Sequence, residues 1–176
     1  TLGLLGFGKI PRRVGKKAAG FDLDVLAQDP YIDAEEMAEH DVEKVDLEEL
    51  LDRSDFVSVH TPLTDETRGM LGTAEFERMK DSAVLINTSR GPVIDIEALN
   101  AALEAGEVAG AGLDVLPEEP PDDDEPIVDR PDVIASPHAA WYSEASIIEL
   151  RETLFSDLVR VLRGEEPENP VNPDAL

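Results

Sequence analysis

Apolar residues fall into short runs. Between these runs lie longer stretches in which apolar residues recur every three or four positions, as on one face of a helix. The short runs are rich in β-branched or other apolar residues and are nearly continuous. Such runs are typical of parallel strands that helices cover on both faces. The predicted strands are Thr1–Leu5, Asp24–Gln28, Asp55–His60, Ala83–Asn87, Val108–Asp114 and Val133–Ser136.

The stretches between these runs carry helix signals. Asp46 and Asp95 stand where helix N-caps are expected, and Gly106 stands where a helix should end. The predicted helices are Lys9–Gly20, Leu47–Arg53, Gly72–Met79, Ile96–Ala105 and Glu144–Arg163. Strands that alternate with helices in this way predict an α/β fold, a Rossmann-type doubly wound parallel sheet in a single domain.

Three segments follow from this pattern. We expect the sheet domain over residues 1–143, a C-terminal helix over 144–164 and a polar tail over 165–176. The acidic, proline-containing stretch Asp122–Asp132 is predicted to be a surface loop. The chain opens without Met on a strand already under way, which suggests a fragment of a longer protein.

Composition narrows the function classes. The chain has 176 residues and a net charge of −25, from 40 acidic and 15 basic residues, so nucleic acid would be repelled. No apolar run approaches the ~20 residues needed to cross a bilayer. Cysteine is absent, and three scattered histidines predict no metal site. We therefore expect a cytoplasmic protein without membrane or nucleic-acid contacts.

The acidic excess is spread over helices and loops rather than confined to a tail. Such a surface repels itself at low salt and is tolerated where salt screens it. We interpret it as the surface of a protein from a salt-accumulating, halophilic organism. The alternative is an ordinary acidic protein.

A dinucleotide fingerprint follows the first predicted strand. Gly6 would permit the tight turn, Gly8 the close approach of a pyrophosphate, and the amides of Lys9 and Ile10 would face the phosphates. Pro11 replaces the usual third glycine and puts the affinity of the site in doubt more than the fold.

Asp29 follows the second predicted strand, 21 residues after Gly8. A carboxylate at this point accepts hydrogen bonds from the adenosine ribose and repels a 2′-phosphate, so NAD is favoured over NADP. The alternative reading is an ordinary turn residue before Pro30.

Candidate catalytic chemistry lies in the second half of the chain, at Arg90, Glu119 and His138. Arginine grips a carboxylate with two hydrogen bonds, and histidine transfers protons near neutral pH. A glutamate beside a histidine favours the charged imidazole. Each residue alone could be a surface charge, and Glu118 is a rival to Glu119.

The chain resembles the D-isomer-specific 2-hydroxyacid dehydrogenase family. The resemblance covers the NAD-binding domain of that family and implies that a preceding substrate-binding domain is missing. It implies hydride transfer between NAD(H) and the C2 of a 2-keto or 2-hydroxy acid, and a homodimer. The matching stretches are Gly6–Gly8, Asp29–Tyr31, His60–Thr64, Asn87–Gly91, Gly112–Val115 and Ser136–His138.

The resemblance also implies roles for single residues. Arg90 would bind the substrate carboxylate, His138 would be the general acid and base, and Glu119 would hold His138. The remaining residues would contact the cofactor, together with Arg90 and His138: Thr61 and Pro62 at the adenine side, and Thr88 and Asp114 at the nicotinamide.

The stretch Ala139–Glu144 looks most like the C-terminal-binding-protein branch of the family, which contains transcriptional corepressors. Trp141 would then line the substrate pocket, with a packing role at the start of the last helix as the alternative. The branch also supplies a second function hypothesis, an NAD-sensing protein-interaction module. A third option is a degenerate relative that binds nothing, for which Pro11 is the one hint.

Overall fold

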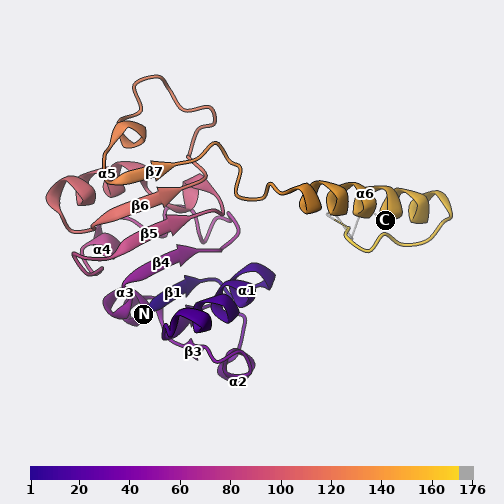
Figure 1. Ribbon diagram of the computed structural model, residues 1–176, viewed down its shortest axis with the longest axis horizontal. Coiled ribbons are helices and arrows are strands. Elements are labelled where there is room, and N and C mark those ends of the chain that lie inside the picture. Colours follow the sequence, from indigo (N-terminus) through magenta and orange to yellow (C-terminus); the bar gives the residue numbers. More distant parts are fainter. Residues whose placement is uncertain (171–176) are drawn as a thin grey trace. The chain divides into compact units, whose positions relative to one another are not determined.

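The predicted sheet is confirmed. In the computed structural model, which describes residues 1–170, seven parallel strands form one sheet in the order β3-β2-β1-β4-β5-β6-β7 (Figure 1). The order reverses between β1 and β4, and in open α/β sheets ligands bind beyond the carboxyl ends of the strands at such a point. The strands are β1 (Leu2–Leu5), β2 (Val25–Gln28), β3 (Glu43–Lys44), β4 (Phe56–Val59), β5 (Val84–Asn87), β6 (Gly110–Leu113) and β7 (Val133–Ala135).

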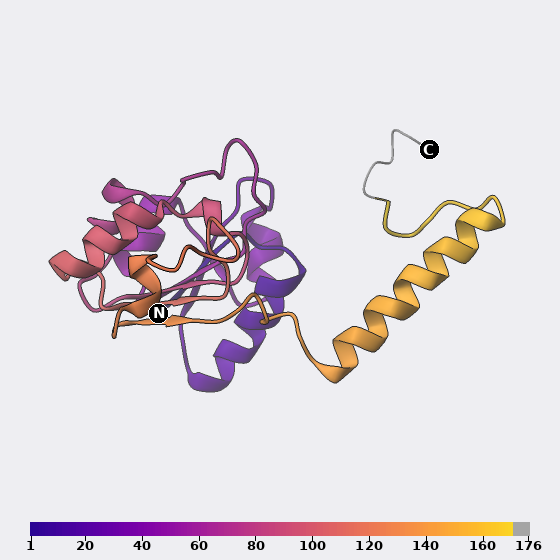
Figure 2. The same ribbon diagram turned by 90° about the horizontal axis from the view of Figure 1, so that it is seen from above.

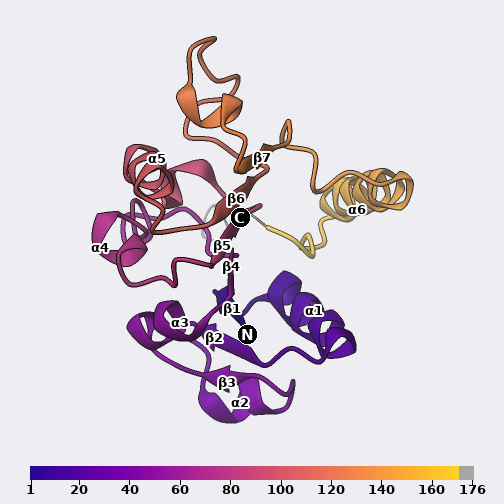
Figure 3. The same cartoon turned by 60° about the vertical axis from the view of Figure 1, so that its left-hand side comes forward.

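Helices cover the sheet from both sides. Helices α3 (Leu47–Arg53), α4 (Thr73–Phe76) and α5 (Ile96–Ala105) lie on one side, and α1 (Lys9–Ala18) lies on the other (Figure 3). The larger core lies under the first group, with Phe76 fully buried in it. A smaller core around Phe7 lies under α1. The burial of apolar side chains on both faces explains why the strands read as nearly continuous apolar runs.

Side chains at the predicted caps form the expected hydrogen bonds. The Asp46 carboxylate accepts from the Glu49 amide at 2.8 Å, and Asp95 accepts from the Glu97 and Ala98 amides at 3.1 Å. Gly106 ends α5 in the left-handed region at φ 76°. These contacts satisfy backbone groups that a helix end leaves without partners.

The sequence pattern missed several short elements. Strand β3 and helix α2 (Ala34–Ala38) lie in a stretch for which no element was predicted. The prediction of a surface loop at Asp122–Asp132 was wrong in part. A 3-10 helix, η3 (Pro126–Asp129), forms there, because the side chain of Ile127 is fully buried in the larger core.

A second compact unit begins at Ala139. Its main element is α6 (Glu144–Leu162), a single uninterrupted helix (Figure 2). Ser143 caps the helix in a reciprocal pair with Ser146. Asp157 accepts hydrogen bonds from the amides of Glu168 and Asn169, so this part of the predicted polar tail folds back onto α6. The rest of that tail, residues 171–176, lies outside the described residues.

In the described part of the chain, no helix is both long and apolar enough to cross a membrane. Among the same residues, no group of acidic, histidine or cysteine side chains could hold a metal ion.

Candidate dinucleotide and active site

Strand register brings the predicted site residues to one edge of the sheet. Leu5 pairs with Gln28 and Val59, Val59 with Asn87, Asn87 with Leu113, and Leu113 with Ala135. Each of these paired residues is the last of its strand, so the residue that follows each one lies at the same edge of the sheet. Those next residues are Gly6, Asp29, His60, Thr88, Asp114 and Ser136.

The turn between β1 and α1 requires glycine. Gly6 has φ 90°, and a Cβ atom there would lie 3.1 Å from the carbonyl oxygen of His60. The His60 amide donates to the Leu5 carbonyl at 2.7 Å, which fixes the two strand ends together. A Cβ on Gly8 would meet nothing within 4 Å, so a ligand has room to approach this backbone.

The N-terminus of α1 offers backbone donors. Arg12 is the first residue whose amide bonds back into the turn, to the Gly8 carbonyl at 3.3 Å. The amides of Lys9 and Ile10 stand before that point and have no partner within the helix. Pro11 is buried in this first turn, where a missing N–H costs nothing. The helix end therefore remains suited to an anion despite the missing third glycine.

Asp29 connects the end of β2 to the glycine turn. One carboxylate oxygen accepts from the Phe7 amide at 2.8 Å, and the other accepts from the Tyr31 amide at 2.9 Å. A cavity of about 670 Å³ opens beside it. Its lining includes Gly6, Gly8, Asp29, Tyr31, His60, Thr61, Pro62 and Glu66.

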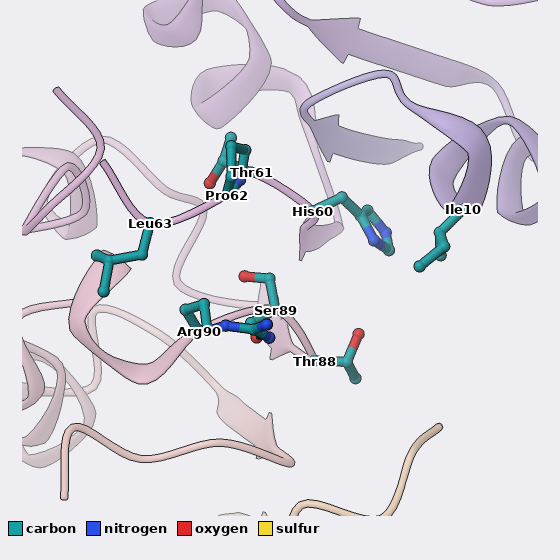
Figure 4. Close-up of a pocket in the computed structure, with 8 residues that line it drawn as sticks. All are labelled: Ile10, His60, Thr61, Pro62, Leu63, Thr88, Ser89 and Arg90. Atoms are coloured by element: carbon teal, nitrogen blue, oxygen red, sulfur yellow. Dashed lines mark hydrogen bonds between the residues drawn. The ribbon is translucent and has the colours of Figure 1, made fainter. Parts of the chain in front are cut away.

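Figure 4 shows the residues that line a second cavity, which has a volume of about 630 Å³. The two share His60, Thr61 and Pro62, so they form one cleft along the carboxyl ends of β1, β4 and β5. In Figure 4 the His60 ring points toward Ile10. The lining of the second cavity is Ile10, His60, Thr61, Pro62, Leu63, Thr88, Ser89 and Arg90.

Asn87, which is fully buried, shapes the loop that carries Arg90. Its amide nitrogen donates to the Arg90 carbonyl at 3.0 Å, and its side-chain oxygen accepts from the Ser89 amide at 3.0 Å. The Arg90 side chain is exposed and donates to the Ser89 carbonyl at 2.6 Å. The loop is thus held by its backbone, while the guanidinium lies at the rim of the cleft.

Glu119 and His138 form a hydrogen-bonded pair. His138 Nδ1 lies 2.7 Å from Glu119 Oε2, and the Leu116 amide donates to Glu119 Oε1 at 3.0 Å. The hydrogen bond with His138 holds the pKa of the Glu119 carboxyl below its usual value, and the Leu116 amide adds to this effect. The rival Glu118 lines a different cavity, beside Ile96.

Asp114 lies in the same region, almost fully buried. It accepts a hydrogen bond from Ser136 Oγ at 2.6 Å. Asp114, Glu119, Ser136 and His138 line a cavity of about 290 Å³. Arg90 lines the second cavity of the cleft instead, so the structure places the predicted catalytic residues at one sheet edge but in two cavities. Trp141 belongs to the second unit, and its role in substrate binding stays a prediction.

His60 was not predicted as a site residue. Its Nε2 lies 2.9 Å from Ser58 Oγ, and burial lowers the pKa of the imidazole to about 4. Two sequence signals pointed to it: His60 stands at the carboxyl end of a predicted strand, and it opens the stretch His60–Thr64 that matches the family. Tyr31, whose hydroxyl donates to Glu66 at 3.2 Å across the first cavity, was missed as well.

Known proteins of one family match the whole chain. The family model "D-isomer specific 2-hydroxyacid dehydrogenase, NAD binding domain" matches residues 1–140. A glyoxylate reductase of Korarchaeum cryptofilum is 43% identical over 176 residues, which are 100% of this chain and 53% of that protein. A D-3-phosphoglycerate dehydrogenase of Archaeoglobus fulgidus is 36% identical over 98% of this chain and 33% of its own length. The chain thus spans about half or less of these relatives.

Solved structures agree with the sequence matches. The NAD complex of a D-isomer specific 2-hydroxyacid dehydrogenase from Lactobacillus delbrueckii ssp. bulgaricus superposes with a TM-score of 0.89 at 34% identity, over 97% of this chain and 56% of that one. A D-lactate dehydrogenase with NAD+ from Lactobacillus jensenii gives a TM-score of 0.88 at 33% identity, over 97% and 55%. The chain therefore belongs to the D-isomer-specific 2-hydroxyacid dehydrogenase family and is its NAD-binding domain.

Proposed function

We propose that the protein is an NAD-dependent dehydrogenase that interconverts a 2-keto acid and a D-2-hydroxy acid. The observation that carries the proposal is the Glu119–His138 pair, 2.7 Å apart, at the sheet edge that also holds the glycine turn. A histidine oriented by a carboxylate is suited to proton transfer at a reacting oxygen. Hydroxypyruvate, glyoxylate and phosphoglycerate are candidate substrates, because all carry the carboxylate that Arg90 would hold.

In this mechanism Arg90 binds the substrate carboxylate with paired hydrogen bonds and fixes which face of the keto carbon is presented. NADH, when bound, supplies the hydride that adds to C2. His138 gives its proton to the keto oxygen as negative charge develops there, and takes the hydroxyl proton in the reverse direction. Glu119 keeps the imidazole oriented and stabilises its positive charge.

The residues that would hold the cofactor fit a dinucleotide. Gly6 and Gly8 leave the backbone open, and the N-terminal amides of α1 at Lys9 and Ile10 can bind phosphate. Asp29 would accept the adenosine ribose hydroxyls and repel a 2′-phosphate, which favours NAD. Thr61 and Pro62 would line the adenine side, with Thr88 and Asp114 near the nicotinamide.

The substitution His138→Gln, made in the complete protein that carries this chain, tests the proposal. It should lower keto-acid reduction by about 10²–10⁴-fold, because the proton donor is lost. The Kd for NADH should stay within about threefold. The control is His40→Gln, which changes a histidine that bonds Arg12 rather than Glu119 and should leave turnover unchanged. Undiminished turnover in the His138 variant would show that His138 is not the proton donor of the proposed reaction.

We further propose a homodimer in the cytoplasm of a salt-accumulating organism. Phe56 and Ile134 support self-association, since both lie on the same face of the sheet and are 43% and 78% exposed. The net charge of −25 supports the salt-rich setting. Sedimentation in molar KCl that showed only a monomer would contradict the dimer.

A second candidate function is an NAD-sensing interaction module of the C-terminal-binding-protein kind. It rests on the stretch Ala139–Glu144 alone. The oligomeric state, measured with and without NAD, separates the two candidate functions when it is combined with an assay of turnover. An assembly that forms only with NAD, together with absent turnover, would favour the module.

A further inference from the structure

The His60 side chain stands where the two cavities of the cleft meet, and the proposed mechanism gives it no role. We infer that His60, anchored through Nε2 by Ser58, donates a hydrogen bond from Nδ1 to the bridging phosphates of the bound dinucleotide. His60 is thus a cofactor-positioning residue. This inference rests on the dinucleotide site described above and deepens it.

The place of His60 in the sheet fixes where its ring can reach. Its amide bonds to the Leu5 carbonyl at 2.7 Å, and its carbonyl oxygen would lie 3.1 Å from a Cβ on Gly6. The backbone of His60 is therefore held directly against the glycine turn. In Figure 4 the ring extends toward Ile10, in the first turn of α1, where backbone amides face a phosphate.

Ser58 anchors the ring. Ser58 and His60 are two positions apart along an extended segment, so their side chains lie on the same side of the sheet. The Ser58 side chain is 7% exposed, and its Oγ lies 2.9 Å from His60 Nε2. Among residues 1–170, Ser58 is the one hydrogen-bond partner of this ring. The other nitrogen, Nδ1, therefore remains able to bond a ligand in the cleft.

A neutral ring can donate from Nδ1 while Nε2 accepts from Ser58. Burial lowers the pKa of His60 to about 4, so the free imidazole is neutral near pH 7. A neutral imidazole carries one N–H, and the nitrogen without it accepts. When the Ser58 hydroxyl donates to Nε2, the hydrogen lies on Nδ1 and points into the cleft. A donor beside the α1 amides is complementary to a phosphate oxygen.

Substitutions at His60 separate this role from simple packing. Asn places an amide near the position of Nδ1, Gln places one near Nε2, and Leu keeps volume without any polar group. The test measures Kd by calorimetry for adenosine, ADP-ribose and NADH on the 176-residue chain and these variants. A hydrogen bond to a charged group is worth about 1.5–3 kcal/mol, or roughly 10–100-fold in Kd.

We expect His60→Leu and His60→Gln to weaken ADP-ribose and NADH binding by at least about tenfold. Adenosine binding should change less than twofold, because adenosine lacks the phosphates. His60→Asn should bind NADH within about threefold of the unchanged chain. Nitrogen-15 spectra should show the hydrogen on Nδ1, with a shift on adding ADP-ribose that adenosine does not cause.

Three outcomes would overturn the inference: unchanged Kd in His60→Leu, an equal loss for adenosine, or the hydrogen on Nε2. Asp29→Ala, measured in parallel, separates the inference from the site itself. If Asp29→Ala weakens NADH binding and His60→Leu does not, only the role of His60 fails. If neither the unchanged chain nor the complete protein that carries it binds NADH, the dinucleotide site fails and this inference fails with it.

Discussion

Gly91 shows how one residue can hold two parts of the site together. A Cβ atom there would overlap the backbone of Leu116 and Pro117. Backbone cannot move aside as a flexible side chain can, so the Arg90 and Glu119 loops would have to separate. We expect Gly91→Ala to lower the free energy of unfolding by about 1–3 kcal/mol, measured by urea denaturation.

Gly20→Ala is the matched control for this prediction. A Cβ on Gly20 would meet nothing within 4 Å, and its backbone does not lie in the left-handed region. Its unfolding free energy should stay within about 0.5 kcal/mol of the unchanged chain. Equal effects at the two positions would show that the close approach at Gly91 does not matter.

His60 makes stability depend on pH. Burial lowers its pKa to about 4, whereas an unfolded chain has the ordinary value of about 6.5. Above about pH 6.5 both states are neutral at this residue, and its contribution is complete. As the pH falls toward 4 the unfolded state binds a proton first, so stability is lost, by at most about 3 kcal/mol.

The measurement is urea unfolding of the unchanged chain and His60→Asn between pH 7 and 4.5. Acid also protonates carboxylates and relieves their repulsion, so only the difference between the two proteins isolates His60. That difference should change in favour of the variant as the pH falls. Parallel pH profiles would show that the ring is solvated in the folded state.

Some residues of the candidate site could be predicted from the sequence, and others could not. Glu119 and His138 were predictable because their chemistry is uncommon and their motifs are specific. Which of Glu118 and Glu119 pairs with the histidine was not decided by residue type, since the turn geometry decides it. His60 was missed because the burial that lowers its pKa arises only in the tertiary structure.

At the element scale, helix α5 depends on its cap. Asp95 accepts two amide hydrogen bonds, and the helix that follows buries Leu99 and Leu103 in the larger core. We expect Asp95→Ala to lower the free energy of unfolding by about 1 kcal/mol. Glu104→Ala, at an exposed position of the same helix, should change it by less than about 0.5 kcal/mol. Similar effects in both variants would contradict a specific capping role.

Elements with their own periodicity or caps were predicted, and elements that depend on neighbours were not. Strand β3 has two residues, both exposed, and pairs only through Leu26 and Ala27 of β2. Its sequence, Glu43-Lys44, carries no strand signal. Helix η3 likewise forms because Ile127 reaches the core, in a segment whose acidic composition indicated a loop. Tertiary contacts overrode local propensity in both cases.

At the scale of the whole molecule, the prediction of fold and cofactor succeeded for a common reason. A doubly wound sheet has few possible arrangements, and its carboxyl edge is where ligands bind. Six residues that follow strands therefore had to converge once the strand order was known. The net charge of −25 did not take part in that inference, because charge bears on solubility and association rather than on fold.

The net charge of −25 should make the thermal stability of the protein depend on salt concentration. Like charges spread over one surface destabilise the compact state, and at 1 M salt the screening length falls to about 3 Å. The melting temperature of this −25 chain should therefore rise from low to molar KCl. Glycine betaine at equal osmolality is the control, because it does not screen charge. A melting temperature that stayed level or fell with KCl would contradict adaptation to a salt-rich interior. Replacing Asp122, Asp123 and Asp124 by Asn should reduce the dependence on salt, since it removes neighbouring like charges while leaving the core intact.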